Sequence, residues 1–325
     1  FGIAVIYTVF NVFATCILLP FSEGLEKLAY LTIREDDSEN MRIRHIDEDI
    51  KMLDSRFMNN PALAMEQCRR VIYHMADTVR ESCGKSAELL HNYTQEKAES
   101  IWQMEKDADR YEDVLGTYLM KLTGRDLSEK DSRALTLYLN AIGEFERISD
   151  HAAGIASAYG KMREKEQVFS NKAQEELTVF SRAVVRMTEV SCRIFQEEDT
   201  ELIHEVEALR VVVEELARAV RKRHVKRLRK GKCTIELGFL LSDIVTGYER
   251  ITAHCGHIAA GIVQVRDDSL EMHNYNQEIR ESNMEEYKEF PENFGSSLVG
   301  IRYLTVEIMH SFCNEKLCII FVVHF

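Results

Sequence analysis

The amino-acid sequence predicts an all-α protein made of tandem three-helix bundles with six long antiparallel helices, and three observations support this prediction. Proline and glycine are scarce, with 3 and 15 occurrences among 325 residues, so few positions interrupt regular structure. Hydrophobic residues make up 45% of the chain, and long runs are rich in Ala, Leu, Glu, Lys and Arg. The helical pattern of residues 132–158 also returns at 235–262, which indicates an internal repeat.

The segment 132–158 has the spacing of a helix with one buried face. Apolar or small side chains recur along it at alternating steps of four and three, which keeps them facing a partner helix. This seam consists of Tyr138, Ile142, Phe145, Ser149, Ala152, Ala156 and Tyr159. Gly143, Ala153 and Gly154 lie beside the seam and are small enough to leave room for a bound cation.

Residues 1–22 are predicted to be the last transmembrane helix of a truncated membrane domain. No charged residue occurs in 1–21, and at about 1.5 Å per residue this stretch spans about 30 Å, enough for a bilayer core. A buried helix of a soluble domain is the alternative. Basic residues that follow, such as Lys27 and Arg34, predict by the positive-inside tendency that the region after residue 22 is cytoplasmic.

Residues 23–60 are polar and charge-rich, and we interpret them as a linker. Asn60 and Pro61 then form a good helix start, with Asn as the N-cap and Pro at the first helical position. Two three-helix repeats follow, at 61–161 and 170–266. Their helices are expected near 61–91, 94–123, 128–160, 171–196, 199–230 and 234–265.

The end of the chain has two further parts. Residues 267–292 have the composition of a polar C-terminal helix. The tail 293–325 is apolar but carries charges at Glu307, Glu315 and Lys316, so it makes a poor membrane span and stays unassigned.

Four acidic residues of the first repeat are the candidate metal ligands. Glu105 and Asp109 lie four residues apart on the second helix, and Glu146 and Asp150 lie four apart on the third. Like charges at this spacing repel on a helix, and a bound multivalent cation would remove the repulsion. The alternative is a solvated acidic face that pairs locally with arginine.

The second repeat carries a weaker version of this pattern. Glu205 is followed four residues later by leucine, and Glu249 by alanine, so each pair has lost its second acid. His254 lies beside the lost position, and together with His257 it could chelate a metal, although a structural role is the commoner one for such histidines. Glu205, Glu249 and His254 are therefore weaker candidate ligands.

Composition and motifs exclude several functions. A net charge of −13 argues against nucleic-acid binding. The sequence has no Walker loop, GxGxxG, GxSxG or HExxH motif, and we expect no enzymatic activity. Ferritin-like di-metal oxidases use Glu-x-x-His spacing on their helices, whereas the acid pairs here are ExxxD.

Two segments resemble the third helix of PhoU-type domains: ERISDH at 146–151 and ERITAH at 249–254. EKDADR at 105–110 resembles the acidic motif on the second helix of that family. The resemblance implies tandem three-helix bundles whose ExxxD motifs bind a metal cluster. It assigns this role to Glu105, Asp109, Glu146 and Asp150, with a divalent or trivalent ion such as iron, zinc or magnesium.

FNVFATCILLPFSEGLEKLA, which begins at residue 10, resembles the end of the membrane domain of bacterial sodium/phosphate cotransporters, and LDSRFMNNPALAMEQCRR at 53–70 resembles the entry to their cytoplasmic PhoU-like domain. This resemblance implies the C-terminal portion of a sodium-dependent phosphate symporter in the inner (plasma) membrane. Inorganic phosphate and sodium would pass through the missing membrane domain. A homodimer or a regulatory protein partner is also expected. The alternative is a membrane-tethered PhoU-like regulator of phosphate signalling without transport activity.

Overall fold

The computed structural model describes residues 46–199 and 202–266, and these residues form helices and no strands. A short helix at 46–52 and a 3-10 helix, η2 (Ser55–Asn59), precede six long α-helices. The six are α4 (Pro61–Glu88), α5 (Gln95–Leu122), α6 (Glu129–Glu164), α7 (Asn171–Glu197), α8 (Ile203–Arg229) and α9 (Ile235–Arg266). The predicted all-α class with six long helices is confirmed.

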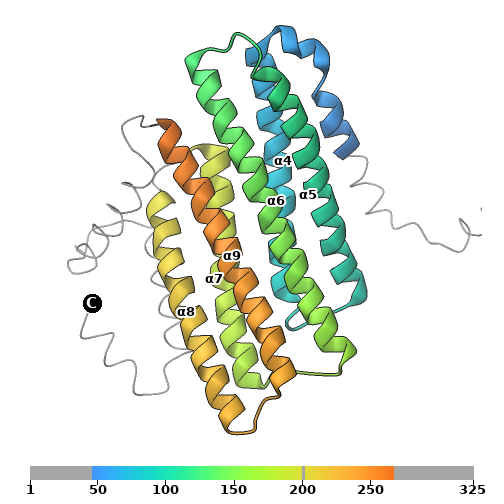
Figure 1. The fold of residues 1–325 in the computed structure, drawn as a ribbon, viewed down its shortest axis with the longest axis vertical. Coiled ribbons are helices and arrows are strands. Elements are labelled where there is room, and N and C mark those ends of the chain that lie inside the picture. Colours follow the sequence, from blue (N-terminus) through green and yellow to red (C-terminus); the bar gives the residue numbers. More distant parts are fainter. Residues whose placement is uncertain (1–45, 200–201, 267–325) are drawn as a thin grey trace, which may run out of the picture. The chain divides into compact units, whose positions relative to one another are not determined.

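The first three-helix unit, α4 to α6, begins each helix with a polar cap. The side chain of Asn60 accepts a hydrogen bond from the backbone of Leu63, which confirms the predicted start at Pro61. Thr94 caps α5 and Ser128 caps α6 in the same way. Side-chain caps satisfy backbone N–H groups that have no partner within the helix. Short loops join the helices, so neighbours run antiparallel (Figure 1).

The second unit, α7 to α9, has the same arrangement but different helix ends. Helix α7 ends at Glu197, and its C-cap residue, Glu198, adopts a left-handed conformation with φ of 53°. The turn between α8 and α9 contains Gly231 with φ of 64°, a conformation that glycine adopts without steric cost. Thr234 then accepts a hydrogen bond from the backbone of Leu237 at the start of α9.

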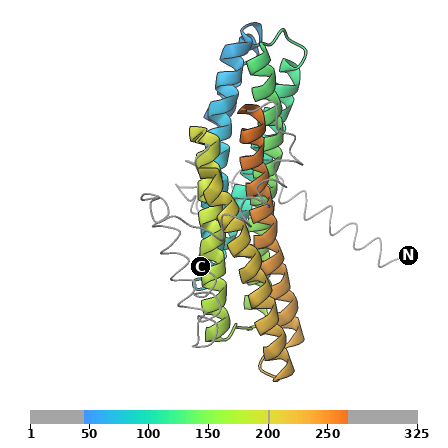
Figure 2. The same cartoon turned by 90° about the vertical axis from the view of Figure 1, so that its left-hand side faces the viewer.

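The third helices of the two units, α6 and α9, make the most extensive contact between elements. A Cβ atom at Gly247 would lie 2.8 Å from Ile155, and one at Gly261 would lie 3.2 Å from Leu137. These contacts fix an antiparallel register in which the two backbones approach closely. The units lie side by side and shifted along their helix axes (Figures 1 and 2).

The hydrophobic core is continuous across the two units. Phe195 of α7 packs edge-on against Tyr73, Tyr138 and Phe145 of the first unit, with ring centroids 5.4 to 6.1 Å apart. All seven residues of the seam predicted on α6 are buried. Residues 52–266 therefore pack as one compact unit around both repeats.

Two helix bounds differ from the predicted ones by four residues, and the others differ by three or fewer. Helix α6 continues through Gly160 to Glu164, because Gly160 here allows a close approach of the Tyr93 hydroxyl rather than ending the helix. Helix α8 begins at Ile203, four residues later than expected. Part of the predicted linker is helical, at 46–52 and in η2.

Several predictions fall outside the described residues. These are the transmembrane helix at 1–22, the first part of the linker, the polar helix at 267–292 and the tail at 293–325. None of the helices in the described ranges combines the length and apolar character that a membrane span requires.

Candidate metal centre

The four predicted ligands of the first repeat lie on two helices that pack together, Glu105 and Asp109 on α5 and Glu146 and Asp150 on α6. The structure brings three of them into one group. A carboxylate oxygen from each of Glu105, Asp109 and Asp150 lies within 4.8 Å of the other two. Three acidic side chains therefore converge across the α5–α6 interface.

Burial and mutual repulsion perturb this group. Partial burial raises the pKa of Glu105, and the nearby charges of Asp109 and Asp150 raise it further. Burial and Asp150 likewise raise the pKa of Asp109. Removing water from a carboxylate and placing another negative charge beside it both disfavour ionisation. The group is thus electrostatically unfavourable when all its members are ionised.

Glu146 lies outside the three-residue group but close to it. Burial raises its pKa, and the charges of Asp150 and Asp109 act in the same direction. Within the described part of the chain, none of the four carboxylates forms an ion pair with lysine or arginine. A Cβ atom added at Gly143 or Gly154 would have no neighbour within 4 Å among the described residues. The surface of α6 therefore has open space at both positions.

The donor set fits a hard or borderline multivalent cation. Carboxylate oxygens are the ligands that Mg²⁺, Ca²⁺ and related ions prefer. Three of them at a half-buried to exposed surface leave further coordination positions for water or an added ligand. A positive ion here would also offset the repulsion that raises the pKa values.

Two further acids of α5 belong to this surface and were not predicted from the sequence. Asp113 raises the pKa of Asp109, and Glu112 raises that of Glu146. Both follow Asp109 at helical steps of three and four, so the acidic stripe continues for another turn. The i to i+4 spacing from Asp109 to Asp113 was the sequence signal for this extension.

The weaker candidates of the second repeat have arginine partners. Arg186 of α7 donates to Glu205 of α8 at 2.7 Å, and the Glu205 side chain is only 9% exposed. Arg221 of α8 donates to both carboxylate oxygens of Glu249 on α9, at 2.6 and 2.5 Å. Bidentate arginine–carboxylate pairs are strong and satisfy the acid within the protein. The structure does not bring Glu205 and Glu249 together as a ligand group.

His254 has a partner that the sequence did not reveal. Its Nδ1 atom lies 2.7 Å from Oε2 of Glu144 on α6, 110 residues earlier in the chain. His151 stacks on His254 with ring centroids 5.4 Å apart and an interplanar angle of 20°. No local spacing links Glu144 to His254, since only the packing of α6 on α9 joins them.

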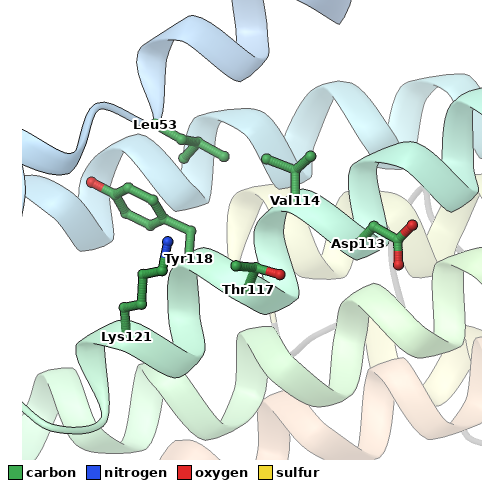
Figure 3. A pocket seen from close by; sticks show the side chains of 6 residues that line it. All are labelled: Leu53, Asp113, Val114, Thr117, Tyr118 and Lys121. Atoms are coloured by element: carbon green, nitrogen blue, oxygen red, sulfur yellow. The ribbon is translucent and has the colours of Figure 1, made fainter.

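A separate hollow of about 460 Å³ lies along α5, beyond the carboxylates (Figure 3). Leu53, Tyr118 and Lys121 line one end, and Asp113 lies at the other. The Tyr118 hydroxyl donates to the backbone carbonyl of Asp54 at 2.9 Å, which fixes the segment that precedes η2. No group of ligand atoms converges in this hollow, so it is not a candidate metal site.

Two solved structures of PhoU proteins have folds similar to this one. PhoU from Pseudomonas aeruginosa matches with a TM-score of 0.57 at 18% identity, over 62% of this chain and 95% of that one. The phosphate transport system regulatory protein PhoU from Streptococcus pneumoniae matches with a TM-score of 0.58 at 17% identity, over 65% and 99%. At these identities the likeness concerns the fold alone. No curated protein matches the sequence.

The sequence itself matches the PhoU domain twice, at residues 72–158 and 177–262. Each match runs from the first helix of a unit to its third helix, so the two matches coincide with the two structural repeats. Together they cover more than half of the chain. The chain therefore belongs to the PhoU domain family.

Proposed function

We propose that this chain is the C-terminal portion of a sodium-dependent phosphate symporter whose cytoplasmic, metal-binding PhoU-like domain regulates phosphate transport. The observation that carries the proposal is the order of its parts. An uncharged, membrane-length segment at 1–21 precedes a pair of PhoU repeats. That order resembles the sodium/phosphate cotransporters, in which the last membrane helix leads into the cytoplasmic domain.

In this proposal the α5–α6 carboxylates hold a divalent or trivalent cation. Glu105 and Asp109 supply oxygens from α5, and Glu146 and Asp150 supply them from α6. The raised pKa values of Glu105, Asp109 and Glu146 support this role, since burial and the neighbouring carboxylates raise them more than Lys106 and Arg147 lower them. A cation shared by two helices ties them together, and its occupancy changes the charge that this surface presents to a partner.

The role of the helical domain is regulatory rather than enzymatic. Phosphate and sodium pass through a membrane domain upstream of residue 1, in the plasma membrane, and the domain acts on the cytoplasmic side. It works as a homodimer or through a regulatory protein partner. The net charge of −13 supports the absence of nucleic acid among its partners.

Sodium dependence tests this proposal directly. The full-length version of the protein, in proteoliposomes or in cells lacking other phosphate uptake, should accumulate phosphate when an inward sodium gradient is present. Replacing sodium by potassium or choline should reduce uptake to the background of empty vesicles. Phosphate uptake that is equal with and without sodium would contradict the symporter function.

The alternative is a membrane-tethered PhoU-like regulator of phosphate signalling that does not itself transport. One observation favours it: about two thirds of this chain accounts for nearly the whole of a regulatory PhoU protein, 65% against 99%. This alternative predicts no phosphate uptake by the full-length protein. It also predicts that deleting the chain changes the response of phosphate-regulated genes without removing a sodium-coupled uptake route.

A further inference from the structure

A second group of possible metal ligands lies between the two repeats. Glu144 extends from α6, and His254 and His257 lie one turn apart on α9. Oε2 of Glu144 lies 2.7 Å from Nδ1 of His254 and 3.1 Å from Nδ1 of His257. All three ligand atoms lie within 4.8 Å of one another.

We propose that Glu144, His254 and His257 bind one divalent first-row transition-metal ion, such as Zn²⁺, which clamps the first repeat to the second. Two imidazoles and one carboxylate form a donor set that zinc and iron take in three-ligand protein sites. The group differs in chemistry from the all-oxygen carboxylates between α5 and α6. The proposal stands whether or not those carboxylates hold a cation.

The distances suit such an ion. With zinc–ligand bonds of about 2.0–2.2 Å, the ligand atoms of a tetrahedral site lie about 3.3–3.5 Å apart. The two carboxylate-to-imidazole distances here, 2.7 and 3.1 Å, need to lengthen by roughly 0.6–0.8 Å and roughly 0.2–0.4 Å, which side-chain rotation can supply. Each neutral histidine would move its proton from Nδ1 to Nε2, which frees Nδ1 to bind the metal.

The surroundings hold two ligands in place and leave the third accessible. The side chains of His254 and Glu144 are 11% and 24% exposed, whereas that of His257 is 59% exposed. His151 stacks on His254 and limits the rotation of its ring. Close packing at Gly247 sets the spacing of α6 and α9. The ion would therefore enter from solvent past His257 onto two pre-positioned ligands.

The two repeats differ at two of the three ligand positions. When ERISDH at 146–151 is aligned with ERITAH at 249–254, Glu144 corresponds to Gly247 and His257 corresponds to Gly154, whereas His254 corresponds to His151. Glycine therefore stands in the other repeat at the positions of Glu144 and His257. The complete set exists only where the two repeats pack together, so its binding energy would depend on their docking.

Cobalt substitution tests the proposal, because Co²⁺ takes zinc sites and its visible absorption reports imidazole ligation and coordination geometry. The full 325-residue chain is titrated with Co²⁺ in excess Mg²⁺, which occupies all-oxygen sites but competes poorly for imidazole. We expect one bound Co²⁺ per chain, with intense visible absorption bands that indicate low-symmetry coordination. His257→Ala should weaken binding by more than the roughly 10–100-fold that loss of an outer-shell partner costs.

Matched controls separate the site from adventitious binding. His204→Ala removes an exposed histidine on α8 and should leave the spectrum and stoichiometry unchanged. Glu105→Ala with Asp109→Ala should also leave them unchanged, even if it abolishes binding at the other site. Glu144→Gln should weaken binding as His257→Ala does. Full retention of the cobalt spectrum in His257→Ala, or equal loss in His204→Ala, would overturn the proposal.

Discussion

The α5–α6 and α8–α9 helix pairs occupy equivalent places in the two repeats, yet they treat their acidic side chains in opposite ways. In the first pair, Glu105, Asp109 and Asp150 gather within 4.8 Å, and none of them forms an ion pair with lysine or arginine among the described residues. In the second pair, Arg221 binds Glu249 through two hydrogen bonds.

This difference shows that the three-helix scaffold does not itself require a bound cation. The second repeat pairs Glu205 and Glu249 with arginine, whereas the first keeps more acids and, among the described residues, forms no arginine ion pair with them. Retaining repelling charges destabilises the metal-free fold, since burial and neighbouring charges raise the pKa of each of Glu105, Asp109 and Glu146. We therefore propose that the acids of the first repeat, and not those of the second, bind a metal ion.

The largest effect should be on metal content. Glu146→Ala combined with Asp150→Ala should remove the metal bound by the α5–α6 carboxylates, because it deletes the ligands from α6 while α5 stays intact. An ion held by Glu144, His254 and His257 should remain. Elemental analysis measures the metal content per chain after dialysis against buffer without transition metals. The matched control is Glu249→Ala, whose carboxylate already has an arginine partner and should not change the metal content. Unchanged metal in the double variant would mean that the acids are only a charged surface.

The next largest effect should be the loss of a partly buried ion pair in the second repeat. Arg186→Ala leaves Glu205, with a side chain 9% exposed, without its arginine. We expect the free energy of unfolding to fall by about 2 kcal/mol, since the carboxylate loses its charged hydrogen-bond partner. Urea denaturation measures it. Arg193→Ala breaks an exposed pair with Glu197 and should cost under about 1 kcal/mol. Equal costs would show that Glu205 is not desolvated.

Neutralising one acid should have opposite signs in the two repeats. In the presence of a metal chelator, Asp150→Asn should stabilise the protein by about 0.5 kcal/mol at neutral pH, because the substitution removes a negative charge that repels its neighbours. Glu249→Gln should destabilise it by a similar amount. Because the native pKa values of Glu105 and Asp109 are raised, native carboxyls hold protons more tightly than unfolded ones, so their contribution to stability falls as pH rises. The gain from Asp150→Asn should therefore shrink toward acidic pH, and a gain that grows there would contradict this account.

A further effect should be the pH dependence of the contact between the repeats. His254 and His257 lower the pKa of Glu144 to about 2, and Glu144 raises the pKa of His257. Glu144 then contributes stability above its ordinary value of 4.5, and that contribution is lost as pH falls toward 2. His257 contributes stability below its ordinary value of 6.5, and that contribution is lost as pH rises through its native pKa.

Between pH 4.5 and pH 6.5, the metal-free wild-type protein should therefore be more stable than Glu144→Gln by about 1 kcal/mol. The gain is modest because the His257 side chain is 59% exposed. Thermal unfolding in chelator across the pH range measures the difference. A difference that is constant from acidic to alkaline pH would show that the ionised pair contributes nothing.

The helices and their buried faces could be predicted from the sequence because their signals are local. The cap at Asn60 and the seam from Tyr138 to Tyr159 depend on spacing within one helix, and both were confirmed. The end of α6 was misplaced because the helix continues past Gly160, where the Tyr93 hydroxyl lies 3.1 Å from the position of an added Cβ atom. A tertiary contact of this kind leaves no mark in the local pattern.

The same distinction explains which site residues were found. Spacing within α5 and within α6 identified Glu105, Asp109, Glu146 and Asp150, and packing of these helices brought three of the four together. The arginine partner of Glu249 lies 28 residues away, and the glutamate partner of His254 lies 110 residues away. Periodicity cannot reveal partners on different helices, so those contacts required the fold.

The central claim is that the α5–α6 carboxylates share a cation, and anomalous X-ray diffraction from crystals grown with iron tests it most directly. We predict an anomalous peak at about 2.0–2.2 Å from oxygens of Glu105, Asp109 and Asp150, with Glu146 close enough to join them. Crystals that show no peak there, with the four carboxylates turned apart into solvent, would contradict the claim.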